Sequence, residues 1–236
     1  MKAPTPRLAA PLAAAFAVLA LTATGASAAT TTIHEETAAG APYSGNWQVS
    51  TVGPLTFSVV YLGATVTGSC TSATLRGSVA STGAGELTAA SIGACQTSNG
   101  LSSPATDLDL SQLPDRSGQI AYAPVPGGRD GVLTVNGGLS FKLQGNILGI
   151  PITCYYGFQT GGVPGLSFDV YNRDNPNRPL PALDDAQGKS DNITLVRQSG
   201  SSSLCPSNGT GKGAGIARGE STPGSGVFDR KLYLTS

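Results

Sequence analysis

The sequence predicts an all-β protein, either a sandwich or an irregular antiparallel barrel of about ten to twelve short strands. Two observations support this fold class. Apolar residues recur at every second position in several short runs, which is the pattern of strands with one buried face. These runs are separated by turn-forming segments rich in Gly, Ser and Thr, and the chain contains 32 glycines. After residue 28 we find no apolar stripe with the helical spacing of about 3.6 residues.

The first 28 residues have the composition of a secretory signal peptide. Lys2 and Arg7 precede an almost wholly apolar run, which ends in the small residues Ala26-Ser27-Ala28 that suit a signal peptidase. The run is shorter than the about 20 apolar residues of a membrane-spanning helix. We therefore expect cleavage after residue 28 and a secreted, extracellular protein without a membrane span.

The rest of the chain is long enough for one domain with a hydrophobic core. Residues 29–42 are mostly polar, and we expect them to form a flexible lead-in. Residues 43–236 are expected to form a single β domain. Within it, residues 171–192 break the alternating pattern and are rich in Pro, Asp and Asn, which predicts a long loop.

The charge of the chain excludes some classes of partner. It has 14 basic and 14 acidic residues, and charged residues are 12% of the total, about half the usual share. Nucleic acids and anionic membrane surfaces attract clustered positive charge, which this sequence lacks. The partner we expect is an extracellular polymer or protein.

Four cysteines follow the predicted signal peptide, and an even number in an exported protein predicts two disulfides. Three pairings are possible. We favour Cys70–Cys95 and Cys154–Cys205, because each bond then closes a local excursion of the chain. The alternation around Cys70 and Cys154 turns both side chains toward the core.

Strands are expected wherever apolar side chains alternate. The clearest hairpin joins residues 133–135 to 139–143 through Asn136-Gly137-Gly138. A three-residue loop would place Val135 opposite Leu139 and keep one apolar face. In chain order, the expected strands lie at 55–61, 65–70, 75–79, 133–135, 139–143, 150–158, 166–170, 193–196 and 227–234.

No catalytic constellation is apparent in the sequence. Catalysis by a Ser-His-Asp or Cys-His arrangement needs a general base, and the only histidine, His34, lies in the expected lead-in. The cysteines are too far apart in sequence for a zinc-binding pattern. We therefore expect a non-catalytic protein without a metal or cofactor.

Two groups of carboxylates leave alternatives open. Asp107 and Asp109 alternate with leucines, so both would lie on one face of a strand, either as its solvent face or as the acids of a secreted hydrolase. Asp184, Asp185 and Asp191 could contribute to a Ca²⁺ site, although their spacing does not match an EF-hand. A solvated loop is the other interpretation of this second group.

Aromatic side chains suggest an alternative binding function. Trp47, Tyr155, Tyr156 and Tyr171 could form a flat surface that stacks against sugar rings, which would make the protein a carbohydrate- or wall-polymer-binding module. Tyr155 is the best single candidate, because alternation places it on the face opposite Cys154. Packing in the core or at its rim is the other use for these residues.

The chain resembles a broad group of uncharacterised, secreted, disulfide-containing actinobacterial proteins. The residues that carry the resemblance are Tyr43-Ser44-Gly45, residues 74–79, the run 85–92 that leads to Cys95, and the closing strand at 228–235. They cover about half of the chain after the signal peptide. The resemblance implies a β-rich fold and supplies no catalytic residue. We expect an exported, non-catalytic interaction protein of the extracellular space or cell envelope.

Overall fold

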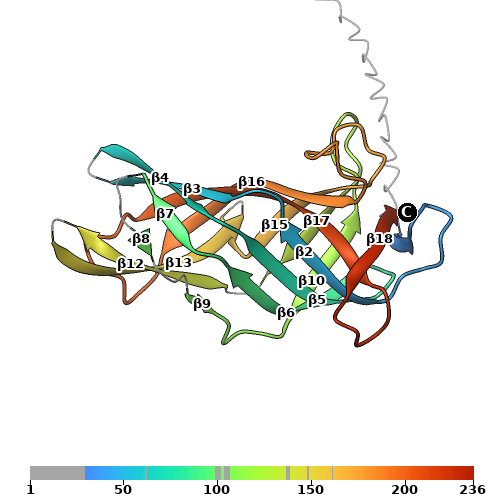
Figure 1. Ribbon diagram of the computed structural model, residues 1–236, viewed down its shortest axis with the longest axis horizontal. Helices are drawn as coiled ribbons and strands as arrows, with labels where there is room; N and C mark the ends of the chain where they lie inside the picture. The colour runs from blue at the N-terminus through green and yellow to red at the C-terminus, as the bar shows by residue number, and fades with distance from the viewer. Residues whose placement is uncertain are drawn as a thin grey trace, which may run out of the picture.

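The computed structural model contains only β-strands as regular elements in its described residues, and 18 strands form one sheet (Figure 1). The predicted signal peptide at 1–28 lies outside these residues. No helix in this part of the chain is long and apolar enough to cross a membrane. The structure describes residues 30–61, 63–98, 102–103, 107–136, 139–147, 149–160 and 162–236.

Eight strands close into an antiparallel barrel. Each of these strands pairs with two others in the ring, and the ring closes where β17 pairs with β2, so the barrel has no open edge. The barrel alternative of the prediction is therefore confirmed and the sandwich alternative is not. The strands are β2 (Gly45–Thr51), β5 (Ala73–Val79), β6 (Ala84–Ile92), β10 (Asp115–Tyr122), β11 (Gly131–Val135), β15 (Leu166–Tyr171), β16 (Ala186–Arg197) and β17 (Asn208–Glu220).

Strands β16 and β17 extend beyond the barrel and carry two further groups of strands. Along its edge away from β16, β17 pairs first with β3 (Leu55–Tyr61) and then with β2. Along its edge away from β17, β16 pairs first with β15 and then with β13 (Ile150–Thr160). The molecule is consequently elongated (Figure 1). The β3 side contains β3 (Leu55–Tyr61), β4 (Ala64–Cys70), β7 (Cys95–Thr97) and β8 (Ser102–Ser103). The β13 side contains β9 (Asp107–Asp109), β12 (Ser140–Ile147), β13 (Ile150–Thr160) and β14 (Val163–Pro164). These extra strands explain why the strand count exceeds the predicted one.

The expected lead-in contains an ordered strand. β1 (Thr32–Glu35) pairs with the closing strand β18 (Phe228–Thr235), which also pairs with β17. Ile33 is 3% exposed and belongs to the core. Because a buried apolar side chain and a paired backbone both hold this segment, it differs from the flexible segment expected from its polar composition.

The predicted hairpin across Asn136-Gly137-Gly138 is wrong. β11 pairs with β10 and β15, whereas β12 pairs with β13 and β9. Val135 and Leu139 are nevertheless both buried. The shared alternation correctly indicated that both strands face the core, but it carries no information on which strands pair.

Both predicted disulfides are present. Cys70–Cys95 joins the neighbouring strands β4 and β7 with an S–S distance of 2.02 Å. Cys154–Cys205 joins β13 to the turn before β17 with an S–S distance of 2.06 Å. All four residues are at most 4% exposed, so the inward orientation predicted for Cys70 and Cys154 is confirmed.

The long loop is shorter than predicted and tightly bound. It occupies residues 172–185, because β15 ends at Tyr171 and β16 begins at Ala186. The inward-facing residues in the first half of β16 are Ala186, Gly188 and Ser190. Because they are small or polar, the sequence lacks the apolar alternation from which a strand is predicted. Within the loop, Leu180 donates its backbone N–H to Gln187 Oε1 at 2.7 Å.

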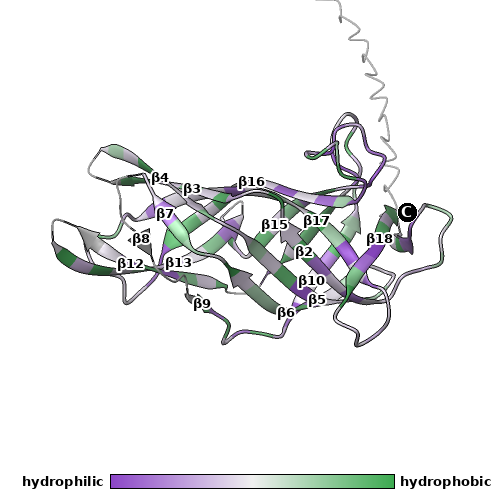
Figure 2. Cartoon of the chain, in the orientation of Figure 1, coloured by the Kyte–Doolittle hydropathy of each residue, from purple (hydrophilic) through white to green (hydrophobic). Residues whose placement is uncertain are grey.

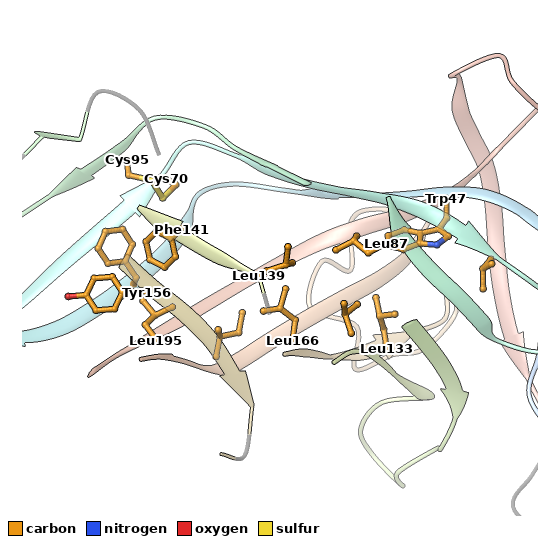
Figure 3. Close-up of a cluster of buried hydrophobic side chains, with 14 of the residues drawn as sticks. Trp47, Cys70, Leu87, Cys95, Leu133, Leu139, Phe141, Tyr156, Leu166 and Leu195 are labelled. Atoms are coloured by element: carbon orange, nitrogen blue, oxygen red, sulfur yellow. A yellow bond between two sulfur atoms is a disulfide. The ribbon is translucent and has the colours of Figure 1, made fainter. Parts of the chain in front are cut away.

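The core runs through the barrel and on between the two added groups of strands, rather than forming a compact centre. Figure 3 follows it from Cys70, Cys95 and Tyr156 at one end to Leu133 and Trp47 at the other. It is incompletely filled, because apolar cavities of about 80, 60 and 30 Å³ lie within it.

Candidate functional site

Three of the four aromatic candidates are buried, and Tyr156 is the most deeply buried of them at 1% exposed. Trp47 is 6% exposed, and its indole N–H donates to the backbone oxygen of Ser78 at 3.1 Å. Tyr171 is 7% exposed, and burial raises the pKa of its hydroxyl. Because a sugar-stacking ring needs an accessible face, none of the three forms the predicted aromatic surface.

Tyr155 lies on the outer face of β13, as alternation predicted. Its ring is half-buried and lies close to Gly200. Its backbone N–H donates to Ser201 Oγ at 2.9 Å. Without Trp47 and Tyr171 beside it, Tyr155 is an isolated half-exposed ring rather than part of a flat platform.

The carboxylates at 107–109 occupy β9, which pairs with β12. Asp109 is exposed and accepts a hydrogen bond from the backbone N–H of Ser111 at 2.9 Å. Hydrogen bonds from Ser111 lower the pKa of this carboxyl. A lowered pKa suits an ionised carboxylate, whereas the general acid of a glycosidase needs a raised one.

The acidic residues of the predicted loop are neutralised separately. Asp184 pairs with Arg173 and with Lys231, and Arg218 donates to both oxygens of Asp185 at 2.8 and 3.0 Å. These contacts stabilise the loop. Among the described residues, no group of three or more His, Cys, Asp or Glu side chains is arranged to hold a metal ion.

Asp191, the third acidic candidate, lies away from the other two. It pairs with Lys189 at 2.6 Å on β16 and borders a polar groove on the outer surface of the β3 side. The groove has a volume of about 640 Å³. It is lined by Thr56, Phe57, Ser58, Thr67, Gly68, Ser69, Gln96, Thr97, Ser98, Asp191, Thr210, Gly211 and Lys212.

Strand register arranges the groove's hydroxyl groups in rows. Thr210 of β17 lies opposite Ser58 of β3, which lies opposite Thr67 of β4. In the parallel row, Thr56 lies between Lys212 and Ser69. Residues on neighbouring strands at these paired positions project from the same face of a sheet. The outcome is a continuous polar surface across three strands.

Gln96 and Ser98 form the far wall of the groove. Gln96 of β7 lies opposite Ser69, so it extends the second row to a fourth strand. Ser98 holds this wall against β4: its backbone N–H donates to the backbone oxygen of Thr67 at 2.7 Å, and its Oγ accepts from the Thr67 N–H at 3.2 Å. Both Gln96 and Ser98 are exposed.

The opposite face of the same strands is apolar and faces the core. Phe57 is 7% exposed and lies between Gly68 and Gly211 in the register. A Cβ atom at Gly68 would come within 2.2 Å of the Phe57 ring. The ring therefore needs a glycine beneath it, and this packing fixes the strands whose outer face forms the groove.

The groove carries little charge. Asp191 is neutralised by Lys189. Lys212 is exposed, and no ion-pair partner faces it in the described part of the chain. Most of the side chains that line the groove thus carry a hydroxyl or amide group, which can both donate and accept hydrogen bonds.

The sequence does not reveal this groove. Its residues on β3 and β4 alternate with inward-facing ones in two expected strands, whereas those on β7 and β17 lie where no strand is expected. Thr56 and Ser58 have the pattern of any solvent-exposed strand face. This polar alternation does not by itself indicate a binding site. Only strand pairing shows that β3, β4, β7 and β17 combine their polar faces. No protein-family model, curated protein or solved structure matches the chain.

Proposed function

We propose that the protein is an exported, non-catalytic interaction protein that binds a neutral, hydroxyl-rich polymer, such as a wall or extracellular polysaccharide, in the polar groove. The observation that carries this proposal is the alignment of Ser, Thr and Gln side chains across four strands along one groove. Two disulfides and the lack of a membrane-spanning helix in the described residues are consistent with an extracellular location.

The chemistry of the lining favours a neutral ligand. Hydroxyl and amide groups can donate to and accept from sugar hydroxyls, and their weak net charge gives no strong attraction for a polyanion. The groove also lies on an outer sheet surface, so a polymer longer than the groove can extend past both ends. Lys212 would donate to a ring or hydroxyl oxygen at one side.

The experiment is a pull-down with insoluble neutral polysaccharides, followed by affinity measurement on soluble fragments of any polymer that binds. The test variant combines Thr56→Val with Ser58→Ala, which removes two central hydroxyl groups at nearly constant side-chain volume. Each hydrogen bond is worth about 0.5–1.5 kcal/mol, so we expect about tenfold weaker binding.

Thr134→Val is the matched control. Thr134 lies on β11, on the half-buried face between Leu133 and Val135, and it is not part of the groove. Binding of this variant should equal that of the unaltered protein. The proposal is wrong if no neutral polymer binds, or if the groove variant and the Thr134→Val control bind equally well.

A further inference from the structure

The barrel encloses apolar space that its own side chains leave unfilled. Two cavities of about 80 and 60 Å³ lie next to each other, because the same four residues line both. Val49, Leu75 and Phe168 belong to this shared wall. All three pack against the core yet keep part of their surface exposed.

Gly188 is the fourth shared residue. A Cβ atom added to Gly188 would meet no atom within 4 Å, and its φ is outside the left-handed region. Its register neighbours are Val170 on β15 and Gly215 on β17. A strand normally uses an inward position to fill the barrel. At Gly188 this position is left open instead.

Small residues on the opposite strands enlarge the same space. Ala73 on β5 pairs with Ile92, and Ala90 on β6 pairs with Leu75. Both alanines line the largest cavity. The open volume therefore results from short side chains on several strands, rather than from one displaced side chain.

Three polar side chains at the walls of the cavities already have partners. Thr51 Oγ1 accepts from the backbone N–H of Ala73 at 2.8 Å. Asn172 bonds to the backbone of Leu234, and Gln187 to that of Leu180. A water molecule inside a protein needs about two to four polar partners. Water and ionised groups are thus disfavoured here, and an apolar ligand is favoured.

A third cavity of about 30 Å³ extends the row toward the disulfide end. It shares Leu55, Ile92, Phe158 and Ile193 with the largest cavity. Each cavity is smaller than the about 150 Å³ space that accepts benzene. A narrow chain can occupy successive cavities, whereas a benzene ring requires more volume than any one of them offers.

We propose that the barrel interior binds one unbranched aliphatic chain, such as the alkyl or acyl tail of a neutral lipid. The chain lies along the barrel, passes over Gly188 and occupies the neighbouring cavities. This site is separate from the polar groove, and it would remain if the groove bound no polymer.

The chain's only tryptophan supplies a direct probe, because Trp47 lines the second cavity. Titration with n-alkanols from hexanol to decanol should raise the melting temperature. Affinity should increase about fourfold per added methylene group, which corresponds to about 0.8 kcal/mol per buried CH₂. An ω-bromo-alkanol of the same length should quench Trp47 fluorescence with the same affinity.

Variants that fill the cavity make the test specific. Gly188→Val and Ala90→Leu should each weaken binding at least tenfold. Ala89→Leu is the matched control, because Ala89 is exposed on the same strand and does not line the cavity. It should bind as the unaltered protein does. If Gly188→Val fails to fold, Gly188→Ala adds a single methyl group to open space and should weaken binding several-fold.

Three results would overturn the proposal. The first is the absence of any shift or quenching with any alkanol. The second is an affinity that does not depend on chain length. The third is equal affinity in Gly188→Ala, Ala90→Leu and Ala89→Leu, since binding would then occur outside the barrel.

Discussion

The side chain of Asn172 pairs with the backbone of Leu234 as a neighbouring strand would. Asn172 Nδ2 donates to the Leu234 oxygen at 2.9 Å, and the Leu234 N–H donates to Asn172 Oδ1 at 2.7 Å. Asn172 is 4% exposed, and Leu234 is also buried. One side chain thus connects the start of the 172–185 loop to the closing strand β18, and the loop serves the fold rather than acting as a free surface element.

Asn172→Ala should destabilise the protein by about 2–6 kcal/mol, because it leaves the buried N–H and C=O of Leu234 without partners, at about 1–3 kcal/mol for each group. Urea denaturation followed by Trp47 fluorescence measures the change. Asn177→Ala, at an exposed position of the same loop, should leave the midpoint unchanged. A small effect of Asn172→Ala would show that water replaces the carboxamide.

Asp184 should make stability depend on pH in acid. Lys231 and Arg173 hold the pKa of this carboxyl at about 2, below the ordinary value of 3.8. The folded protein therefore binds this proton less readily than the unfolded chain. The stabilising contribution is complete above pH 3.8 and is lost as the pH falls toward 2.

Melting temperatures measured through this pH range should consequently fall less steeply for Asp184→Asn than for the unaltered protein, and the difference should shrink at high salt. Asp229→Asn, at an exposed position on β18, is the control. Parallel curves for the unaltered protein and Asp184→Asn would contradict the assigned role of the two ion pairs.

The two disulfides should contribute unequally. They link residues 25 and 51 positions apart, and a longer loop loses more entropy in the unfolded chain when it is closed. Replacing Cys70 and Cys95 with alanine should cost about 3.5 kcal/mol, and replacing Cys154 and Cys205 about 4 kcal/mol. Urea denaturation of the two double variants tests the order, and the reverse order would indicate structure in the unfolded state.

Two glycines should respond to alanine in opposite directions. Gly188→Ala enters open space and should raise stability by about 0.4–1 kcal/mol, because alanine has less freedom in the unfolded chain. Gly77→Ala should destabilise, because its Cβ would lie 1.9 Å from the backbone oxygen of Glu86. Thermal unfolding compares the two. A destabilising Gly188→Ala would mean that the cavity is filled.

Tyr155→Ala distinguishes the groove from an aromatic binding surface. Tyr155 lies on β13 and is not part of the groove lining, so its removal should leave polymer binding unchanged. The pull-down described for Thr56→Val with Ser58→Ala provides the measurement. A loss of binding in Tyr155→Ala alone would move the site to the outer face of β13.

The sequence by itself determined the fold class and the covalent connections. Alternation at Cys70 and Cys154 turned both cysteines inward, and local closure selected the correct pairing among three. These features are local, because the direction of a side chain depends on position within a strand. The same alternation did not identify Trp47 and Tyr171 as core residues, since it shows which residues share a face but not which face is buried.

Strand pairing was decided only by the tertiary structure. Val135 and Leu139 have the alternation of a hairpin, yet their strands pair with different partners, because the lowest free energy depends on contacts between residues far apart in sequence. The polar groove and the space over Gly188 arise in the same way. Each is formed by short segments of several strands, and none of those segments contains a motif of its own.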